Sequence, residues 1–373
     1  MRLPCIVGLL CAGLGLSAAA QNRTGRELRP EPVLTLEPGP GNPRNSEGDF
    51  IRLKDGRILF AYSHFTGGSD DDAASHIAVR ASKDGGRTWT QQDEILVPNE
   101  GRMNTMSVSF LRLRSGAIAL FYLVKHSPAD CRLVVRFSKD EAQTWSEPRL
   151  CMETGGHFVV NNDRVIQLKG GRIVVPAARH SLPGQDFRPR GEALCFLSDD
   201  EGQTWRPGRS ILTAPPDSRT GLQEPGLIEL QDGRLMMLCR TDLGCQYRAY
   251  SSDGGDTWTD AAASDILSPV SPATLGRVPG KGELLMVWND HRAIAPSLQN
   301  RRTPLRVALS RDEGRSWERV KNLETDPDGW YCYTALEFLK DHVLLAYCAG
   351  DRKTGGLNRT RILRMPISWF YRK

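Results

Sequence analysis

The sequence SKDGGRTW, from Ser82 to Trp89, decides the fold of this chain because the same pattern returns four more times. The later copies begin at Ser138 (SKDEAQTW), Ser198 (SDDEGQTW), Ser251 (SSDGGDTW) and Ser310 (SRDEGRSW). Successive copies begin 56, 60, 53 and 59 residues apart, and a period of this size is typical of repeat proteins. In each copy the aspartate can accept backbone N–H groups within a turn, and the tryptophan packs the turn down. The pattern specifies an architecture, and it does not specify an activity.

A second repeat, out of phase with the first, predicts one β-hairpin in each unit. Each copy is a short apolar run, a turn that contains Gly or Asp, and a second apolar run. The copies begin at Leu53 (LKDGRILFAY), Leu113 (LRSGAIALFY), Leu168 (LKGGRIVVPA), Leu230 (LQDGRLMMLC), Val278 (VPGKGELLMVW) and Leu339 (LKDHVLLAYC). Six hairpins, one in every ~57 residues, predict an all-β fold: a six-bladed β-propeller with four-stranded antiparallel blades.

The two ends of the chain predict how the ring closes. After the last hairpin there is room for one more strand, Thr360–Pro366, and no sixth Ser-Asp-Trp turn follows it. Pro32–Leu36 is a strand-like run without a hairpin of its own. We expect this N-terminal strand to complete the last blade from outside, because closure removes free sheet edges. A linear solenoid is the alternative.

The N-terminal residues predict the compartment. Residues 1–20 combine an early arginine, an apolar stretch and the ending Ser-Ala-Ala-Ala, which is typical of a cleavable signal peptide. Lipid attachment at Cys11 is the alternative. We expect a secreted or periplasmic protein without membrane insertion, with residues 21–373 forming a single domain and a monomer. The net charge of +5 is scattered, so nucleic acid is not an expected partner.

The cysteines do not predict a metal site. Seven remain after residue 20, and none has C-x-x-C spacing, so neither a metal nor a cofactor is expected. Cys332 and Cys348 flank the last hairpin and are candidates for a disulfide.

Strand alternation predicts which residues share one end of the propeller. If the hairpin turns and the Ser-Asp-Trp turns lie at one end, the remaining connections lie at the other. The strands on either side of the Asp232-Gly233 turn bring Glu224 and Arg240 together at that other end. The same argument places Tyr333 there. The loops and strand ends expected beside them contribute Arg44, Asp70, Asp71, Asp72, Arg301 and Arg302.

These motifs together resemble the sialidase (neuraminidase) superfamily over nearly the whole mature chain, with the Ser-Asp-Trp turns matching its Asp-boxes. The resemblance implies a six-bladed propeller that cleaves terminal sialic acids without a cofactor. It implies three arginines that hold the sugar carboxylate, an Asp acid/base, and a Tyr nucleophile paired with a Glu. The matching residues in this chain are Arg44, Arg240 and Arg302 as the arginines, Asp72 as the acid/base, Tyr333 as the nucleophile and Glu224 as its partner.

Three of these matches leave alternatives. Asp71 competes with Asp72, and Tyr331 competes with Tyr333. The Arg-Ile-Pro motif of the family is absent, and PRNSEGDFIRLKDG stands in its place. Arg44 is therefore about two residues out of register with the first family arginine.

The chemistry explains why such residue types occur together. Arginine matches the geometry of a carboxylate with two parallel donors. A tyrosine, unlike a carboxylate, approaches the anionic sugar without repulsion. Because a tyrosine ordinarily titrates near 10, a neighbouring glutamate must take its proton. The resemblance implies that Asp72 protonates the leaving oxygen and then activates water, so that the configuration is retained.

A polar cluster in HFVVNNDRVIQL, from His157, is expected at the same end and supplies further candidates for substrate binding. These are Asn162 and Arg164, joined by His180 after the next hairpin. Each candidate has a structural alternative: an ion pair for Glu224 and Arg240, a strand aromatic for Tyr333, and a solvated loop or calcium site for Asp70–Asp72. Arg301 or Arg302 could be a surface charge, and the polar cluster could serve strand-end hydrogen bonding. Glu47 also fits the rim, with its role open.

Three functions remain from the sequence. The first is a retaining exo-α-sialidase, a glycoside hydrolase acting on sialylated glycans through a Tyr nucleophile. The second is a glycosidase acting on another acidic sugar. The third is a carbohydrate-binding propeller without catalysis.

Overall fold

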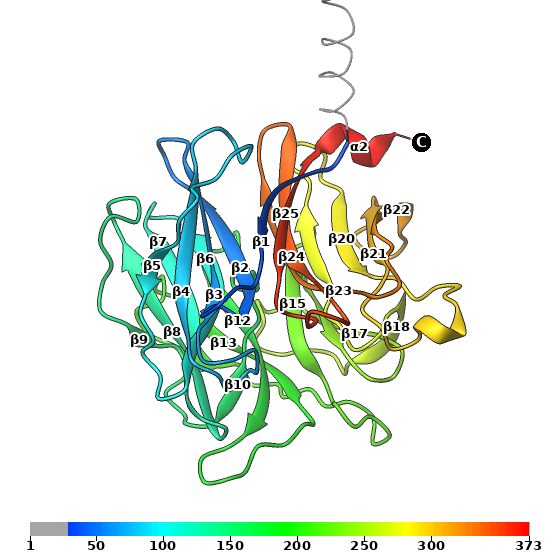
Figure 1. The fold of residues 1–373 in the computed structure, drawn as a ribbon. Helices are drawn as coiled ribbons and strands as arrows, with labels where there is room; N and C mark the ends of the chain where they lie inside the picture. Colours follow the sequence, from blue (N-terminus) through cyan, green and yellow to red (C-terminus); the bar gives the residue numbers. More distant parts are fainter. Residues whose placement is uncertain (1–28, 373) are drawn as a thin grey trace, which may run out of the picture.

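The computed structural model describes residues 29–372, which form five β-sheets (Figure 1). The predicted signal peptide, residues 1–20, lies outside the described residues. Three sheets each consist of four antiparallel strands that are consecutive in the sequence. Their strands are β2 (Arg44–Arg52), β3 (Ile58–Phe65), β4 (Ser75–Ser82) and β5 (Glu94–Val97); β15 (Gln223–Glu229), β16 (Leu235–Arg240), β17 (Cys245–Ser251) and β18 (Ala262–Leu267); and β19 (Thr274–Arg277), β20 (Leu284–Asn289), β21 (Leu305–Ser310) and β22 (Glu318–Glu324).

A larger sheet contains nine strands in two sets. The sets are joined by the parallel pairing of β8 with β10, which consists of the single residue pair Cys131 and His157. The first set is β6 (Asn104–Arg112), β7 (Ile118–Ser127), β8 (Asp130–Ser138) and β9 (Arg149–Leu150); the second is β10 (His157–Val159), β11 (Ile166–Gln167), β12 (Ile173–Ser181), β13 (Glu192–Ser198) and β14 (Arg206–Pro207).

The last sheet joins the two ends of the described chain. Its order is β1 (Glu31–Leu36), β25 (Thr360–Pro366), β24 (His342–Asp351) and β23 (Gly329–Phe338). β1 pairs antiparallel with β25, from Glu31 opposite Arg364 to Leu36 opposite Thr360. Figure 1 shows the dark blue strand running along the red one. The predicted pairing of the N-terminal strand with the final strand is confirmed. Two short helices complete the described elements, η1 (Pro296–Leu298) and α2 (Ile367–Tyr371).

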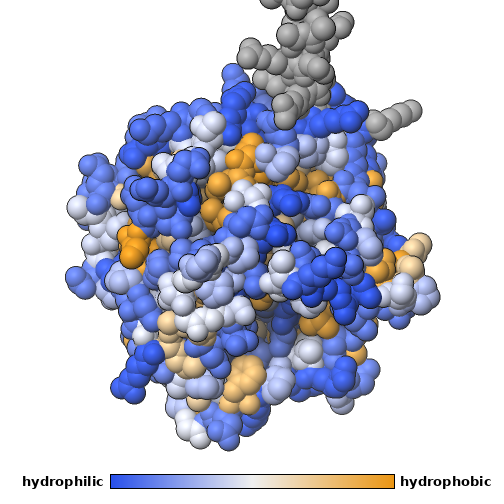
Figure 2. Space-filling view, viewed as in Figure 1, coloured by the Kyte–Doolittle hydropathy of each residue, from blue (hydrophilic) through white to orange (hydrophobic). Residues whose placement is uncertain are grey.

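The six hairpins predicted from the second repeat are confirmed. They pair β2 with β3, β6 with β7, β11 with β12, β15 with β16, β19 with β20 and β23 with β24. The first strands of neighbouring sheets pack against one another: β2 contacts β6 and β23, while β19 contacts β15 and β23. The sheets therefore surround a common axis. Apolar side chains fill the space between sheets, whereas hydrophilic residues predominate on the face seen in Figure 2.

The five Ser-Asp-Trp turns share one hydrogen-bond pattern. In the second copy, for example, Ser138 Oγ and the backbone N–H of Thr144 both donate to Oδ1 of Asp140, each over 2.9 Å. The same bonds recur at Asp84, Asp200, Asp253 and Asp312. An aspartate in this turn satisfies backbone donors that a strand-to-strand connection would otherwise leave unpaired.

Contacts between turns hold neighbouring sheets together. The backbone N–H of Lys54, in the first hairpin turn, donates to Glu141 of the second Ser-Asp-Trp turn over 2.8 Å. The N–H of Ser115 donates in the same way to Glu201 over 3.0 Å. Both kinds of turn thus lie at one end of the molecule, which we call the turn end; the opposite end is the open end.

The described residues bear on two expectations, a disulfide between Cys332 and Cys348 and the absence of membrane insertion. All seven cysteines within residues 29–372 are free thiols. Cys332 and Cys348 are direct cross-strand partners on β23 and β24, but no disulfide joins them. No helix within the same residues is both long and apolar enough to cross a membrane.

Candidate active site

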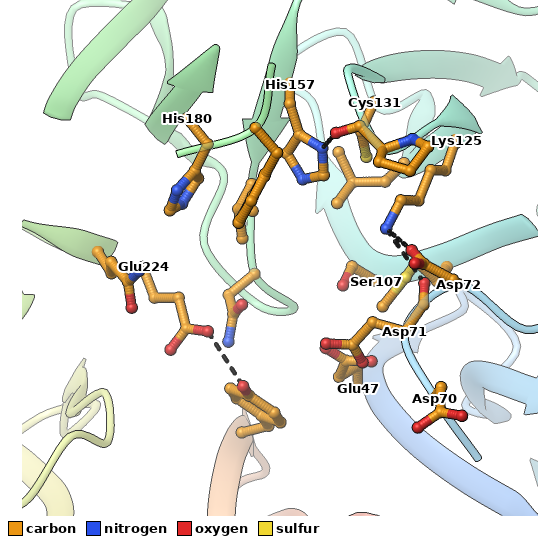
Figure 3. Close-up of a pocket in the computed structure, with 18 of the residues that line it drawn as sticks. Glu47, Asp70, Asp71, Asp72, Ser107, Lys125, Cys131, His157, His180 and Glu224 are labelled. Atoms are coloured by element: carbon orange, nitrogen blue, oxygen red, sulfur yellow. Dashed lines mark hydrogen bonds and ion pairs between the residues drawn. The ribbon is translucent and has the colours of Figure 1, made fainter. Parts of the chain in front are cut away.

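A pocket of about 360 Å³ lies at the open end. It is lined from the starts of β2, β6, β10, β15 and β23, from the ends of β7, β12 and β16, and from the loops between β3 and β4 and between β12 and β13. The polar and aromatic residues that line it include Glu47, Asp71, Asp72, Ser107, Lys125, His157, Asn161, His180, Phe187, Gln223, Glu224, Arg240 and Tyr333. Figure 3 shows several of these side chains converging on the space between them.

Four inner strands carry the same irregularity where they border the pocket. In each, the pairing with the next strand skips two residues, and the first skipped residue has a left-handed backbone. These residues are Glu47 (φ 55°), Ser107 (φ 58°), Glu224 (φ 46°) and Tyr333 (φ 55°). A bulge of this kind redirects a side chain at the end of a strand. Left-handed backbone is costly for residues other than glycine, so a recurrence in four strands that border one pocket points to a functional role there.

The central interaction joins Tyr333 to Glu224. The Tyr333 hydroxyl donates to Oε1 of Glu224 over 3.0 Å, and Arg240 Nη1 lies 2.7 Å from Oε2 of the same carboxylate. Burial raises the pKa of Tyr333, the charge of Glu224 raises it further, and Arg302 and Arg240 oppose both. The tyrosine is therefore neutral at rest, with a base at hydrogen-bond distance. Such a pair can form an activated oxygen nucleophile.

Arg240 and Arg302 lie on two sides of this tyrosine. Arg240 lines the pocket and is held by Gln223, whose Oε1 accepts from Arg240 Nε over 2.9 Å. The Arg302 guanidinium carbon lies 5.1 Å from the centre of the Tyr333 ring, and its Nη1 is buried without a hydrogen-bond partner in the described part of the chain. Arg301 instead turns towards Pro327 and Asp328. Of the two neighbouring arginines, Arg302 is the one beside the tyrosine.

Arg44 is 1% exposed and contacts lining residues without lining the pocket itself. Its Nη1 lies 2.6 Å from Asp71 Oδ1 and its Nη2 lies 2.9 Å from Glu47 Oε2. The guanidinium also stacks over Phe65 at 4.2 Å. The sequence predicts Arg44 as the first of the three arginines that bind the sugar carboxylate. In the structure its guanidinium is already paired with the carboxylates of Glu47 and Asp71.

Asp71 and Asp72 both line the pocket but differ in their partners. Burial raises the pKa of Asp71, but the charge and hydrogen bond of Arg44, with help from Lys125 and Arg240, outweigh burial and bring it below its ordinary value. Asp72 forms an ion pair with Lys125, whose side chain is 8% exposed. Lys125 and these aspartates form one wall of the pocket in Figure 3.

Two histidines and a phenylalanine form another part of the wall. His157 Nδ1 lies 2.7 Å from the carbonyl of Pro128, and His180 Nδ1 lies 2.8 Å from that of Arg188. Phe187 stacks on His180 at 5.0 Å between ring centres. Burial lowers the pKa of His157 to about 4 and also lowers that of His180. Both rings are therefore neutral near pH 7, and since Nδ1 donates to a carbonyl, Nε2 is left as an acceptor.

The two remaining predicted residues lie deeper, near the axis. Asn162 Nδ2 donates to the carbonyls of Gly48 and Tyr333 over 2.8 and 3.1 Å, so it ties together the bulges of β2 and β23. Arg164 Nη1 donates to Thr274 Oγ1 over 3.0 Å. Of this cluster, Asn161 and His157 line the pocket. Within residues 29–372 no group of three or more His, Cys, Asp or Glu side chains is arranged to hold a metal ion.

Comparisons with known proteins identify the family of this chain. Residues 56–344 match a family model described as the BNR repeat-like domain. A sialidase of Micromonospora viridifaciens is 24% identical over 352 residues, which cover 84% of this chain and 51% of that protein. Sialidase-3 of Bos taurus is 27% identical over 397 residues, covering 83% of this chain and 92% of that protein. The chain belongs to the sialidase superfamily.

A structural comparison gives the same fold for this member of the sialidase superfamily. The K499G mutant of the NanB sialidase from Streptococcus pneumoniae superimposes with a TM-score of 0.69 at 13% identity, covering 92% of this chain and 71% of that one. The fold is thus all-β and propeller-like. This chain spans about half the length of the Micromonospora sialidase.

Among the lining residues that sequence reasoning missed in this sialidase-superfamily site are four with polar or aromatic side chains: Lys125, Gln223, Ser107 and Phe187. Lys125 interrupts the apolar run of β7 near its open end, and a buried charge in such a strand is a usable signal. Gln223 directly precedes Glu224. Ser107 and Phe187 carry no comparable signal, because one depends on a bulge and the other on a loop that folds back against His180.

Proposed function

We propose that this protein is a retaining exo-glycosidase that releases terminal sialic acid from glycoconjugates, with Tyr333 as the nucleophile. The observation that carries the proposal is the 3.0 Å hydrogen bond from the Tyr333 hydroxyl to Glu224, inside a pocket that also holds Arg240. A buried carboxylate that accepts from a neutral tyrosine can take its proton during attack. Sialidases with a tyrosine nucleophile depart from the common scheme of two carboxylates.

Recognition of the sugar carboxylate is assigned to Arg240 and Arg302. Arginine binds carboxylates with paired donors, and the buried Nη1 of Arg302 has no hydrogen-bond partner in the described residues. An anion placed beside both guanidiniums would supply that partner and would lie close to Tyr333. His180 and Asn161 would then face other hydroxyl or acyl groups of the ring.

One observation favours a second candidate function. Arg44 is already paired with Glu47 and Asp71, so the sugar carboxylate would have two arginines and not three. A glycosidase that acts on another acidic sugar fits two arginines equally well.

The test is an assay of the purified protein against a panel of fluorogenic glycosides. The panel contains α-sialosides, other ulosonic acid glycosides, uronides and neutral sugars. Proton NMR of the first product formed identifies its anomeric configuration, and retention is expected. Preference for a uronide would select the second candidate. Absence of turnover together with measurable binding of free sialic acid would select a carbohydrate-binding propeller instead.

We further propose that the five sheets act as six blades, because the nine-stranded sheet is joined at a single residue pair. The composition of residues 1–20 supports a cleavable signal peptide and hence a secreted or periplasmic protein. A monomer remains the expected state. Mass spectrometry of the mature N-terminus and light scattering test the last two proposals.

A further inference from the structure

Glu47 is built into the pocket in the same way as the two residues at its centre. In β2 the pairing skips from Ser46 to Asp49, and Glu47 has φ 55°. The bulges of Glu224 and Tyr333 have the same length and the same backbone conformation. Three strands around the axis thus each use a costly bulge to place a reactive side chain in one pocket.

Within residues 29–372, only one of the two carboxyl oxygens of Glu47 accepts hydrogen bonds from neighbouring side chains. Arg44 Nη2 and Ser46 Oγ both donate to Oε2, over 2.9 and 3.1 Å, so Oε1 is the oxygen that can face a bound sugar. The residue is 5% exposed. Figure 3 shows Glu47 next to Asp71 and across the pocket from Glu224. A sugar bound between them would have the Glu47 carboxyl on one side and Glu224, the base for the Tyr333 nucleophile, on the other side.

The surroundings of Glu47 favour its protonated form. Burial raises its pKa, Arg44 on the same strand lowers it, and Asp71 and Glu224 raise it again, with a net pKa above the ordinary value. The thiol of Cys348 on β24 also interacts with this carboxyl. A general acid must carry its proton at the working pH.

The two aspartates beside Glu47 differ from it in exposure and in their partners. Asp71 has a lowered pKa because Arg44 and Lys125 favour its charged form in spite of burial, and its side chain is 67% exposed. Asp72 is ion-paired with the buried Lys125, and its own side chain is 55% exposed. Both Glu47 and Asp71 pair with Arg44, but for Asp71 the nearby cations outweigh burial, whereas for Glu47 burial and the neighbouring carboxylates outweigh the arginine.

We infer that Glu47, and not Asp72, is the catalytic acid and base of the proposed glycosidase. In the first step the Tyr333 oxygen bonds to the anomeric carbon and its proton passes to Glu224. The bond to the leaving group breaks, and the leaving oxygen takes both bonding electrons and the proton of Glu47. In the second step water attacks the anomeric carbon and gives a proton to Glu47. The bond to Tyr333 breaks, and its oxygen recovers the proton from Glu224.

This inference rests on the proposed function, and the test separates the two. Glu47→Gln, Asp71→Asn and Asp72→Asn are compared with the unchanged protein on one glycoside with a good phenolic leaving group and on one natural glycan. For Glu47→Gln we expect a loss of about 10²–10⁴-fold on the natural glycan. On the phenolic glycoside, kcat/KM should change little, and azide should accelerate turnover by taking over the role of water. In the unchanged protein, kcat/KM should fall at high pH because Glu47 loses its proton, and this fall should be absent in Glu47→Gln.

Four results would overturn the inference or its basis. If Asp71→Asn or Asp72→Asn shows this dependence on the leaving group and Glu47→Gln does not, the proton donor is an aspartate. If Glu47→Gln raises KM equally for both substrates, Glu47 binds the sugar and does not transfer a proton. Glu47→Asp and thermal unfolding of each variant exclude a folding defect.

If the unchanged protein cleaves a neutral glycoside only, the sialic acid assignment fails, and Glu47 is tested on that glycoside. If it cleaves no glycoside, both proposals fail.

Discussion

The Tyr333 hydroxyl donates to Glu224 over 3.0 Å although the two residues come from different sheets. Tyr333 belongs to β23 and Glu224 to β15, and β19 lies between them around the axis. The pair therefore depends on the relative placement of three sheets. Any proposal for catalysis must first explain what this hydrogen bond contributes.

Replacing Tyr333 by Phe should reduce kcat by about 10³-fold or more, because the hydroxyl is the proposed nucleophile. Affinity for a sialic acid analogue should change little, since Arg240 and Arg302 remain. Steady-state kinetics and calorimetry measure the two effects. Tyr331→Phe is the matched control, because Tyr331 packs against Tyr347 outside the pocket. Normal turnover by the Tyr333 variant would exclude this nucleophile.

Replacing Arg240 by Ala should weaken binding of a sialic acid analogue by about 1.5–3 kcal/mol for each charge-assisted hydrogen bond lost. The loss arises because the guanidinium beside Glu224 no longer meets the sugar carboxylate. Calorimetric titration measures it. Arg172→Ala is the control, since Arg172 pairs with Asp199 at the turn end and should leave affinity unchanged. Equal affinity in both variants would argue against anion binding at Arg240.

Glu337 should make the folded protein less stable as the pH rises towards neutrality. Burial raises its pKa from 4.5 to about 7, with Arg52 opposing and Asp163 adding to the shift. The folded state therefore holds this proton more tightly than the unfolded chain. Its contribution is fully present below about pH 4.5 and is lost as the pH rises to about 7.

The variant Glu337→Gln should remove this dependence. Between pH 5 and pH 7.5 its Tm should fall less than that of the unchanged protein, by roughly 1–2 °C for each kcal/mol of difference. Thermal unfolding across this pH range gives the comparison. Glu94→Gln, at an exposed position of β5, should keep the original dependence. Parallel curves for the Glu337 variant and the unchanged protein would contradict the prediction.

Glu141 offers a test of the contacts between neighbouring sheets. Its carboxylate accepts from Arg112 over 2.7 and 2.8 Å and from the N–H of Lys54 over 2.8 Å, while its backbone is left-handed at φ 59°. Glu141→Ala should lower the free energy of unfolding by about 1–3 kcal/mol. Glu141→Gly should cost about 1 kcal/mol less, because glycine tolerates this backbone. Chemical denaturation measures both, and kcat should be unchanged. If Glu141→Gly lowered the free energy of unfolding more than Glu141→Ala does, the left-handed backbone at this position would not be a source of strain that glycine relieves.

The repeats made the strand order predictable, because each turn and hairpin is encoded locally. The Asp140 turn needs only residues within its own segment, and the hairpin from Leu53 needs only its own apolar runs. The pairing of β1 with β25 was also predictable, since the N-terminal run has no hairpin of its own and β25, paired with β24, has one edge left for it.

The wall of the pocket was harder to predict because it depends on contacts between sheets. The pairing of Arg44 with Glu47 and Asp71 joins a strand to a loop. The bulge that turns Glu47 into the pocket breaks the period-2 alternation on which strand faces are predicted. Asn162 shows the same limit: its amide binds two backbone carbonyls from different sheets, which a linear sequence does not reveal.

The pairing of β1 with β25 also constrains how the chain is made. The ribosome produces Leu36 before Thr360, and 324 positions separate these partners. The first strand of the described fold thus waits for the last one, and the final sheet assembles only after synthesis of β25. During that wait the exposed edge of β1 is open to pairing with other chains. A chain cut short before Thr360 would lack more than its final strand, because its first strand would never find its place.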